Sequence, residues 1–235
     1  MPLATVEWQG KGRMRTIMAI VAFGVAAAVL FVAFPEIDLA VARSIYIGDN
    51  RFLLSGLPVA TAWVDLTRTL ARALVVALAI GLVLTLILRR AIVGLRWRGY
   101  LFLLLCFGIG TGVIASAVFK DNWGRARPSQ IVEFGGDKRF TPAFAITDQC
   151  PRNCSFVSAD AAFAFGTLGI ALLAGRRPSF VAAALALGVI VGLGRMLTGS
   201  HFLSDVVFSG VFSVLTVLLL DLLFRALAPP TGPTN

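Results

Sequence analysis

The sequence predicts an all-α fold: a polytopic membrane helical bundle with six transmembrane helices. Three observations support this prediction. Only 14% of the 235 residues are charged and the mean hydropathy is +0.87, which is too apolar for a soluble domain of this length. Long uncharged runs recur along the chain, and basic residues gather in the short stretches between alternate runs.

The first half supplies three helices that approach the roughly 20 apolar residues needed to cross a bilayer. They are the uncharged runs 17–34, 73–88 and 100–119. A cleaved signal peptide is the alternative for the first run, because charge precedes it and small residues follow at 40–42. That run is long for a signal core, and the sequence PEID separates it from the small residues, so an uncleaved helix is favoured.

Three further apolar segments complete the six, and each has ionisable residues toward one end. They lie near 158–174, 179–198 and 202–224. The stretches 35–72 and 120–157 are then outer loops. The first contains turn signals at GDN and SGLP, with room for short interfacial helices before and after them. The second is polar and rich in Pro and Gly. We expect one domain over residues 1–235, with its motif-bearing core at about 70–224.

Basic residues lie before the first predicted helix and after the sixth. They also lie in the segments that connect the second helix to the third and the fourth to the fifth. They are Lys11, Arg13, Arg15, Arg89, Arg90, Arg96, Arg98, Arg176, Arg177 and Arg225. The positive-inside rule makes this side cytoplasmic, with both termini there. A net charge of +9 is also typical of nucleic-acid-binding proteins, but the positions of the charges argue against such a partner, and no nucleic acid is expected.

Polar and ionisable residues occupy the outer ends of the later helices. They are Lys120, Arg125, Arg127, Ser158, Asp160, Arg195, His201 and Asp205. Taken singly, each cation could be an interfacial side chain that snorkels to water. Ionisable groups at one membrane depth are costly, however, and a set of them marks a site. Guanidinium groups match phosphate oxygens, so the set favours phosphate handling.

His201 is the only histidine in the chain, and Asp205 follows one helical turn later, on the same helix face. Asp205 could hold one ring nitrogen and leave the other free to attack a phosphorus atom. The alternative is a histidine at a helix start that is merely satisfied by a local carboxylate. These two residues alone leave both interpretations open.

No metal or cofactor is expected. One histidine without a pair of carboxylates at ligand spacing cannot form a zinc or two-metal centre, and no glycine-rich nucleotide-binding loop is present. Cys150 and Cys154 lie in the second outer loop, where they form either a disulfide or two free thiols. Cys106 lies in the third predicted helix and is interpreted as a packing residue.

Two stretches resemble the first and third signature motifs of the type 2 phosphatidic acid phosphatase superfamily of membrane lipid phosphatases. They are KDNWGRARP at 120–128 and GRMLTGSHFLSD at 194–205. The resemblance covers roughly residues 70–224. The middle motif is divergent: the family usually has Pro-Ser-Gly-His, whereas this chain has SFVSADA at 155–161, in which only Ser158 matches.

The resemblance implies a role for each matched residue. The residues that bind phosphate are Lys120, Arg127, Ser158, Arg195 and the backbone N–H of Ala159. His201 attacks phosphorus, Asp205 orients it, and water hydrolyses the phosphohistidine. Asp160, where the family has a histidine, could protonate the leaving oxygen; if nearby cations keep it ionised, another proton donor is needed. Arg125 and Arg152 fall outside the matched positions; they could contact a lipid head group, but they are expected to face solvent.

The resemblance therefore implies a metal-independent phosphatase of a membrane lipid in the bacterial inner membrane, with its site facing the periplasm or exterior. Candidate substrates are phosphatidylglycerol phosphate, phosphatidic acid, polyprenyl pyrophosphate and lipid A phosphate. The altered middle motif is similar to that of bacterial lipid A phosphatases, or it marks another branch. The alternatives are a lipid phosphotransferase of the same fold and a catalytically weak phospholipid-binding membrane protein.

Overall fold

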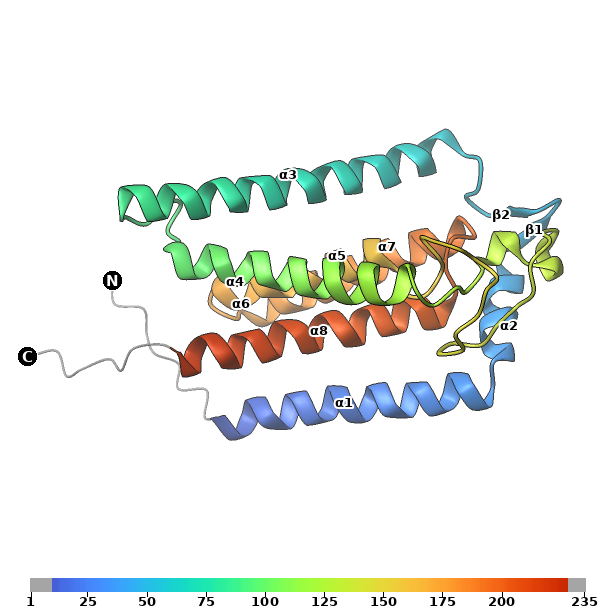
Figure 1. The fold of residues 1–235 in the computed structure, drawn as a ribbon, viewed down its shortest axis with the longest axis horizontal. Helices are drawn as coiled ribbons and strands as arrows, with labels where there is room; N and C mark the ends of the chain where they lie inside the picture. Colours follow the sequence, from blue (N-terminus) through green and yellow to red (C-terminus); the bar gives the residue numbers. More distant parts are fainter. Residues whose placement is uncertain (1–9, 228–235) are drawn as a thin grey trace, which may run out of the picture.

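The computed structural model describes residues 10–227, whose helices run side by side in an elongated bundle (Figure 1). Within these residues, five helices are long and apolar enough to cross a membrane. They are α1 (Gly10–Ala33), α3 (Pro58–Leu88), α4 (Trp97–Phe107) continued by the π-helical segment η1 (Gly108–Lys120), α7 (Pro178–Leu197) and α8 (Leu203–Ala226). The chain is therefore an integral membrane protein with a predominantly helical fold.

The segment expected to form another span at 158–174 differs from that expectation. It forms two short helices, α5 (Ala159–Gly166) and α6 (Leu168–Leu173), which together are shorter than a typical bilayer-crossing helix of about 20 residues. The two helices meet at Thr167, whose hydroxyl donates to the Ala164 carbonyl at 2.6 Å, a local bond that competes with regular helix geometry. The predicted helical bundle is present, but among the described residues the segment predicted as its fourth crossing is short and interrupted.

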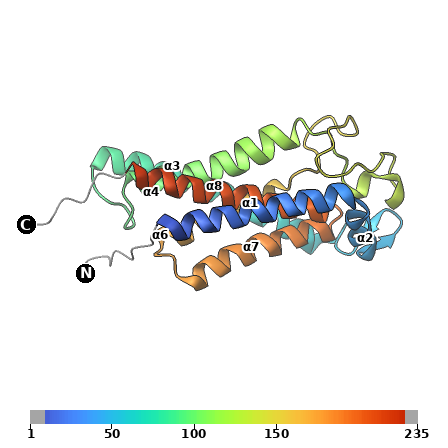
Figure 2. The ribbon, with the colours of Figure 1, turned by 90° about the horizontal axis from the view of Figure 1, so that it is seen from below.

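The two ends of the bundle differ in structure. At one end lie the start of α1, the α3–α4 and α6–α7 connections and the end of α8 (Figure 1). The other end holds α2 (Glu36–Ser44), the two short strands and the long loop after η1, as Figure 2 also shows. The basic residues on which the topology prediction rests lie at the first end, in the connections and in the adjoining helix ends.

The outer segment predicted at 35–72 is shorter than expected, because α3 begins at Pro58 and not near residue 73. Proline is favoured at the first position of a helix, where its missing N–H has no intrahelical acceptor to lose. Residues 58–72 thus belong to a long helix. As a result, α3 brings polar side chains from the predicted outer loop to the bundle wall.

The remaining outer segment, 35–57, contains α2 and a hairpin. Strand β1 (Tyr46–Gly48) pairs antiparallel with β2 (Arg51–Phe52). Asp49 and Asn50 form the turn with φ of 49° and 55°, the left-handed conformation that a two-residue hairpin turn requires and that Asp and Asn tolerate. The turn predicted at GDN is confirmed.

The second outer loop is irregular, as predicted, apart from two single-turn 3₁₀ helices, η2 (Pro128–Gln130) and η3 (Val132–Phe134). Of the two alternatives for its cysteines, the structure has the disulfide between Cys150 and Cys154. Cys106 is a buried free thiol in α4. The loop is therefore closed by a covalent bond close to where the chain enters α5.

An aromatic cluster joins the loop to the helices beneath it. Phe156 is fully buried and packs against Phe119, Trp123, Phe144 and Phe208, with ring centroids 5.1–5.9 Å apart. These rings come from η1, the loop and α8, so the cluster fixes the start of α5 against two long helices. Aromatic pairs at this spacing contribute about 0.5–1.5 kcal/mol each beyond their burial.

Candidate active site

The site residues predicted from the sequence all lie at the end of the bundle that carries α2 and the long loop (Figure 1). Lys120 ends η1, Arg127 precedes η2, Ser158 caps α5, Ala159 and Asp160 begin α5, Arg195 lies in the last turn of α7, and His201 and Asp205 flank the start of α8. The fold therefore brings together side chains that are distant in sequence. Their chemical roles stay predictions.

His201 is buried and held through its Nδ1 atom. Nδ1 lies 2.8 Å from the Ser155 carbonyl oxygen and 3.5 Å from Asp205 Oδ2. Because both neighbours are oxygen acceptors, Nδ1 carries the proton and Nε2 carries the free lone pair. Burial lowers the pKa of His201 to about 3, opposed by Asp205 and reinforced by the charges of Lys120 and Arg195. The imidazole is thus neutral at physiological pH, as a nucleophile must be.

Asp205 acts on His201 less directly than the sequence predicted. Its Oδ2 atom accepts the Ser155 hydroxyl at 2.5 Å and the Phe202 N–H at 2.8 Å. The close acceptor for His201 is instead the Ser155 carbonyl, so Ser155 contacts both residues. Asp205 contributes a nearby negative charge that would stabilise positive charge on the ring.

Arg125 is fully buried between two carboxylates, and the expectation that it faces solvent is wrong. Its Nη1 donates to Asp205 Oδ1 at 2.6 Å and its Nη2 donates to Asp38 Oδ2 at 2.8 Å. Ser204 Oγ and the Thr141 carbonyl accept two further N–H groups. A buried guanidinium requires such partners. Arg125 thereby fixes Asp205 behind His201.

Asp38 on α2 completes this network. Its Oδ1 accepts the Ser204 N–H at 2.9 Å and its Oδ2 accepts the Ser204 hydroxyl at 2.5 Å. Burial raises the pKa of Asp38, and the Arg125 guanidinium opposes that shift by stabilising the carboxylate.

Unlike Arg125, Arg152 has an 82% exposed side chain, so the expectation that Arg152 faces solvent is confirmed.

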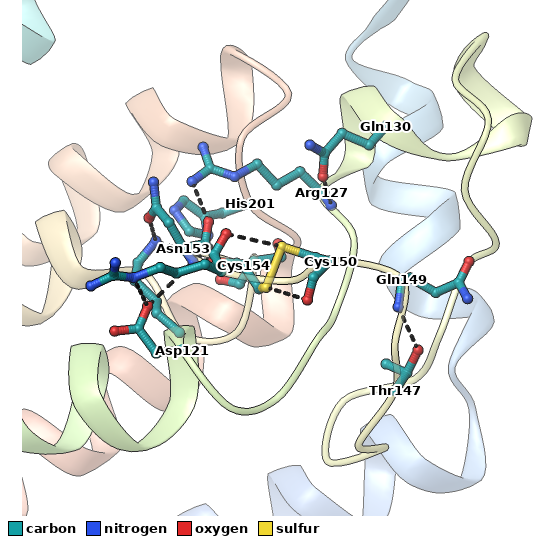
Figure 3. The surroundings of a disulfide bond; sticks show 12 residues. Asp121, Arg127, Gln130, Thr147, Gln149, Cys150, Asn153, Cys154 and His201 are labelled. Carbon is teal, nitrogen blue, oxygen red and sulfur yellow. Dashed lines mark hydrogen bonds and ion pairs between the residues drawn. A yellow bond between two sulfur atoms is a disulfide. The ribbon is translucent and has the colours of Figure 1, made fainter.

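The two cations of the first motif are held by neutral oxygen atoms. Lys120 Nζ donates to Asn153 Oδ1 and to the Cys154 carbonyl, both at 3.2 Å. Arg127 Nη2 donates to the Asn153 carbonyl at 2.8 Å, as Figure 3 shows. Neither side chain has a carboxylate partner within residues 10–227. Their charge is therefore not neutralised by an ion pair and can be offered to an anion.

Asp160, in contrast, is paired with two arginines. Arg68 of α3 donates to it through Nε at 3.1 Å and Nη2 at 3.0 Å, and Arg195 Nε lies 3.1 Å from Asp160 Oδ2. Two adjacent guanidinium groups favour the carboxylate, which has no proton to donate. Asp160 could be either a protonated acid or a carboxylate, and these contacts favour the carboxylate.

The start of α5 provides further donors. Ser158 caps the helix, accepting the Ala161 N–H on its hydroxyl at 3.4 Å, and its own N–H donates to the Asp205 carbonyl at 3.4 Å. The N–H groups of Ala159 and Asp160 have no acceptor among the described residues. Free N–H groups at a helix N-terminus favour an anion, which fits the predicted contribution of Ala159.

A cavity of about 220 Å³ adjoins the Arg68–Asp160 pair between α3, α5 and α7. Its remaining walls are mostly apolar: Leu70, Leu74, Phe163, Leu187 and Val191 are among them. Leu70 and Leu187 are exposed on the bundle wall, where lipid would surround them. The cavity therefore joins the charged site to the apolar flank of the bundle.

Sequence reasoning missed four residues that contact this site: Asp38, Arg68, Asn153 and Ser155. Arg68 could have been found, because an apolar helix read back to Pro58 places it near the outer end of that helix. Asp38 and Arg125 are 87 positions apart, and no sequence motif links them. Ser155 acts partly through its backbone carbonyl, which any residue would supply.

Within residues 10–227, no group of three or more His, Cys, Asp or Glu could hold a metal ion.

Comparisons with known proteins confirm the resemblance seen in the motifs. The model of the PAP2 superfamily matches residues 101–227, more than half of the chain. A lipid A 4'-phosphatase of Francisella tularensis subsp. novicida is 47% identical over 118 residues, covering 49% of this chain and 53% of that protein. A lipid A 4'-phosphatase of Rhizobium leguminosarum is 35% identical over 108 residues, covering 45% and 46%. The chain spans about half the length of the curated relatives it matches.

One solved structure resembles the whole bundle. The crystal structure of a transmembrane PAP2-type phosphatidylglycerolphosphate phosphatase from Bacillus subtilis superposes with a TM-score of 0.56 at 18% identity. The alignment covers 91% of this chain and 98% of that chain. At this identity the likeness concerns the fold.

The buried network makes a prediction about stability. Asp38→Asn keeps the size of the side chain but leaves the buried Arg125 with only one carboxylate. Breaking a buried ion pair from one side costs about 3 kcal/mol or more, so the unfolding midpoint in detergent should fall clearly. The matched control is Asp137→Asn, at an 80% exposed carboxylate, whose midpoint should not change. Equal midpoints for the two variants would contradict the role of Asp38.

Proposed function

The chain belongs to the PAP2 superfamily, and we propose that it is a single-domain membrane lipid phosphatase that uses His201 as its nucleophile. The observation that carries the proposal is the neutral, buried imidazole: Nδ1 is held by an acceptor and Nε2 lies free beside unneutralised cations. A phosphate monoester carries up to two negative charges, which Lys120, Arg127 and Arg195 can match. The site residues predicted from the sequence keep the roles that the family resemblance implies, except Asp160.

The proposed reaction has two steps. Nε2 of His201 attacks phosphorus in line, a P–N bond forms, and the bond from phosphorus to the lipid oxygen breaks. The positive charge on the phosphorylated ring is stabilised by Asp205, which Arg125 and Ser155 hold in place. Water then attacks phosphorus, a P–O bond forms and the P–N bond breaks. The protons of the water stay on the inorganic phosphate that is released, and His201 returns to its neutral form. The N–H groups that begin α5 receive the charge developing on the phosphoryl oxygens.

We propose a different role for Asp160 from the acid that the family's histidine provides. Paired with Arg195 Nε, it leaves the two terminal nitrogens of that guanidinium free to donate to phosphate. Arg68 balances the charge of Asp160. The leaving oxygen then takes its proton from water. Asp160 is in this proposal a positioning residue for Arg195.

The proposed substrate is the phosphate monoester of lipid A, chosen from the candidate membrane lipids because relatives at 47% and 35% identity are lipid A 4'-phosphatases. The cavity beside Arg68 supports a lipid substrate, since its apolar walls suit a hydrocarbon chain next to a charged head group. Phosphatidylglycerol phosphate, phosphatidic acid and polyprenyl pyrophosphate are the competing substrates.

We further propose six membrane crossings in a bacterial inner membrane, with both termini in the cytoplasm and the site facing the periplasm. The start of α1 and the end of α8 lie at the same end of the bundle (Figure 1), which supports an even number of crossings, with the α5–α6 pair proposed as the sixth. The disulfide at the opposite end fits an oxidising compartment.

The nucleophile is tested by phosphate release from a panel of lipid phosphates. His201→Ala should lose about 10⁴-fold or more in kcat, as removal of a nucleophile does elsewhere, while wild-type activity should survive EDTA. Arg139→Ala, at an exposed cation of the same loop, serves as the matched control. Full activity in His201→Ala, or loss of wild-type activity in EDTA, would contradict the mechanism. Formation of a phosphorylated lipid acceptor in place of free phosphate would identify a transferase.

The role of Asp160 is tested by comparing a lipid phosphate with p-nitrophenyl phosphate, whose leaving group needs no proton. If Asp160 positions Arg195, Asp160→Asn should lower kcat/KM by a similar factor for both substrates, about tenfold, because one charge-assisted contact is lost. Arg68→Gln should behave alike. A loss of 10²-fold or more on the lipid alone would identify Asp160 as the general acid.

The topology is tested with fusions to reporters that work on only one side of the membrane. Green fluorescent protein should fluoresce at either terminus, and alkaline phosphatase should be active when inserted beside the exposed Asp137. Five crossings would instead place one terminus in the periplasm and abolish fluorescence there.

A further inference from the structure

The loop that the disulfide closes touches both phosphate-binding cations of the first motif and the nucleophile. Asn153 and Cys154 accept the hydrogen bonds of Lys120 and Arg127. The next residue, Ser155, accepts from His201 Nδ1. Three consecutive residues therefore set the positions of three side chains that the proposed reaction uses. We call residues 150–155 the disulfide loop.

Main-chain bonds also join the disulfide loop to the segment that carries the first motif. The Cys154 N–H donates to the Lys120 carbonyl and the Ser155 N–H to the Arg125 carbonyl, both at 2.9 Å. The Asn153 N–H donates to Asp121 Oδ1 at 3.3 Å. The loop and the motif thus form one paired unit, with the Cys150–Cys154 bond at its edge (Figure 3).

The acceptors in this unit are carbonyl and amide oxygens, and this chemistry matters for phosphate. A carboxylate in the same place would fix Lys120 and Arg127 but would also neutralise them and repel the substrate. Neutral acceptors fix the two side chains and leave their charge available. Pre-organised cations bind an anion more tightly because less side-chain entropy is lost on binding.

We propose that the Cys150–Cys154 disulfide is a redox-dependent positioning element for the phosphate-binding site. This inference rests on the proposed function and adds a regulation of the same site. With the bond closed, Asn153 and the Cys154 carbonyl are held against Lys120 and Arg127. With the bond open, the loop gains freedom, the two cations lose their fixed acceptors, and the affinity for phosphate falls.

A dithiol reductant opens the bond in a balanced exchange. Cys150 is half-buried and Cys154 fully buried, so the reductant's thiolate attacks the Cys150 sulfur and Cys154 leaves as a thiolate that takes a proton. The second thiol of the reductant then closes its own disulfide and releases Cys150 as a thiol. The protein disulfide gains two electrons, and the reductant loses them.

The experiment measures lipid phosphate hydrolysis by the whole protein in detergent, oxidised and after treatment with dithiothreitol. Reduction should raise KM about tenfold and change kcat by less than about twofold. Lys120 and Arg127 lose their fixed acceptors, whereas Ser155 is also held by its bonds to Arg125 and Asp205 and keeps His201 in place. The inhibition constant for inorganic phosphate should rise by the same factor, and reoxidation should restore both. A purely structural role would lower the active fraction, and hence kcat, without moving KM.

Three variants complete the test. Cys150→Ser with Cys154→Ser should reproduce the reduced enzyme and no longer respond to dithiothreitol. Asn153→Gly should raise KM with the disulfide intact, because it removes the Lys120 acceptor at a position whose φ of 53° glycine adopts freely. Cys106→Ala, at the buried free thiol of α4, is the control and should respond to reduction as wild type does.

The outcomes separate the two proposals. Oxidised wild-type protein that hydrolyses no lipid phosphate would contradict the proposed function itself. Active protein whose KM and phosphate inhibition constant are unchanged by reduction and by the cysteine and Asn153 variants would overturn the role of the disulfide loop alone.

Discussion

The burial of one guanidinium, that of Arg125, constrains the rest of the site. Moving a charge out of water costs several kcal/mol unless partners surround it, and here two carboxylates, a hydroxyl and a carbonyl do so. Those partners come from α2, the long loop and α8, so the network joins the outer cap to the start of the last helix. Of the two carboxylates, Asp205 lies beside His201, where positive charge would develop.

Charged side chains in this site are held in two different ways, by ion pairs or by neutral oxygen atoms. Behind His201, cation and carboxylates neutralise one another and give rigidity. In front of it, Lys120 and Arg127 are held by neutral oxygens and keep their charge for a ligand. Arg195 is intermediate between the two, since its guanidinium forms an ion pair with Asp160 and Arg68 shares that carboxylate. Asp160, which stands where the family resemblance predicts a histidine, is thus an ion-paired acid.

The sequence predicts the membrane class, most of the helices and the convergence of the motif residues, because apolar runs and motif spacing are local signals. It does not predict the partnership of Asp38 with Arg125, which depends on a contact across 87 positions. The sequence places Arg68 in a loop because polar residues interrupt the apolar pattern before residue 73, although α3 continues through them. The break at Thr167 is hidden by its apolar neighbours. The Ser155 carbonyl belongs to the backbone and has no signature in the sequence.

In the proposed reaction a neutral His201, fixed by Ser155 and Asp205, forms a covalent bond to phosphorus. The stereochemical course at phosphorus tests it most directly, using a lipid thiophosphate made chiral with oxygen isotopes and hydrolysed in labelled water. Two in-line displacements, one by His201 and one by water, predict overall retention of configuration. Inversion would mean that water attacks the lipid phosphate directly and would contradict the account.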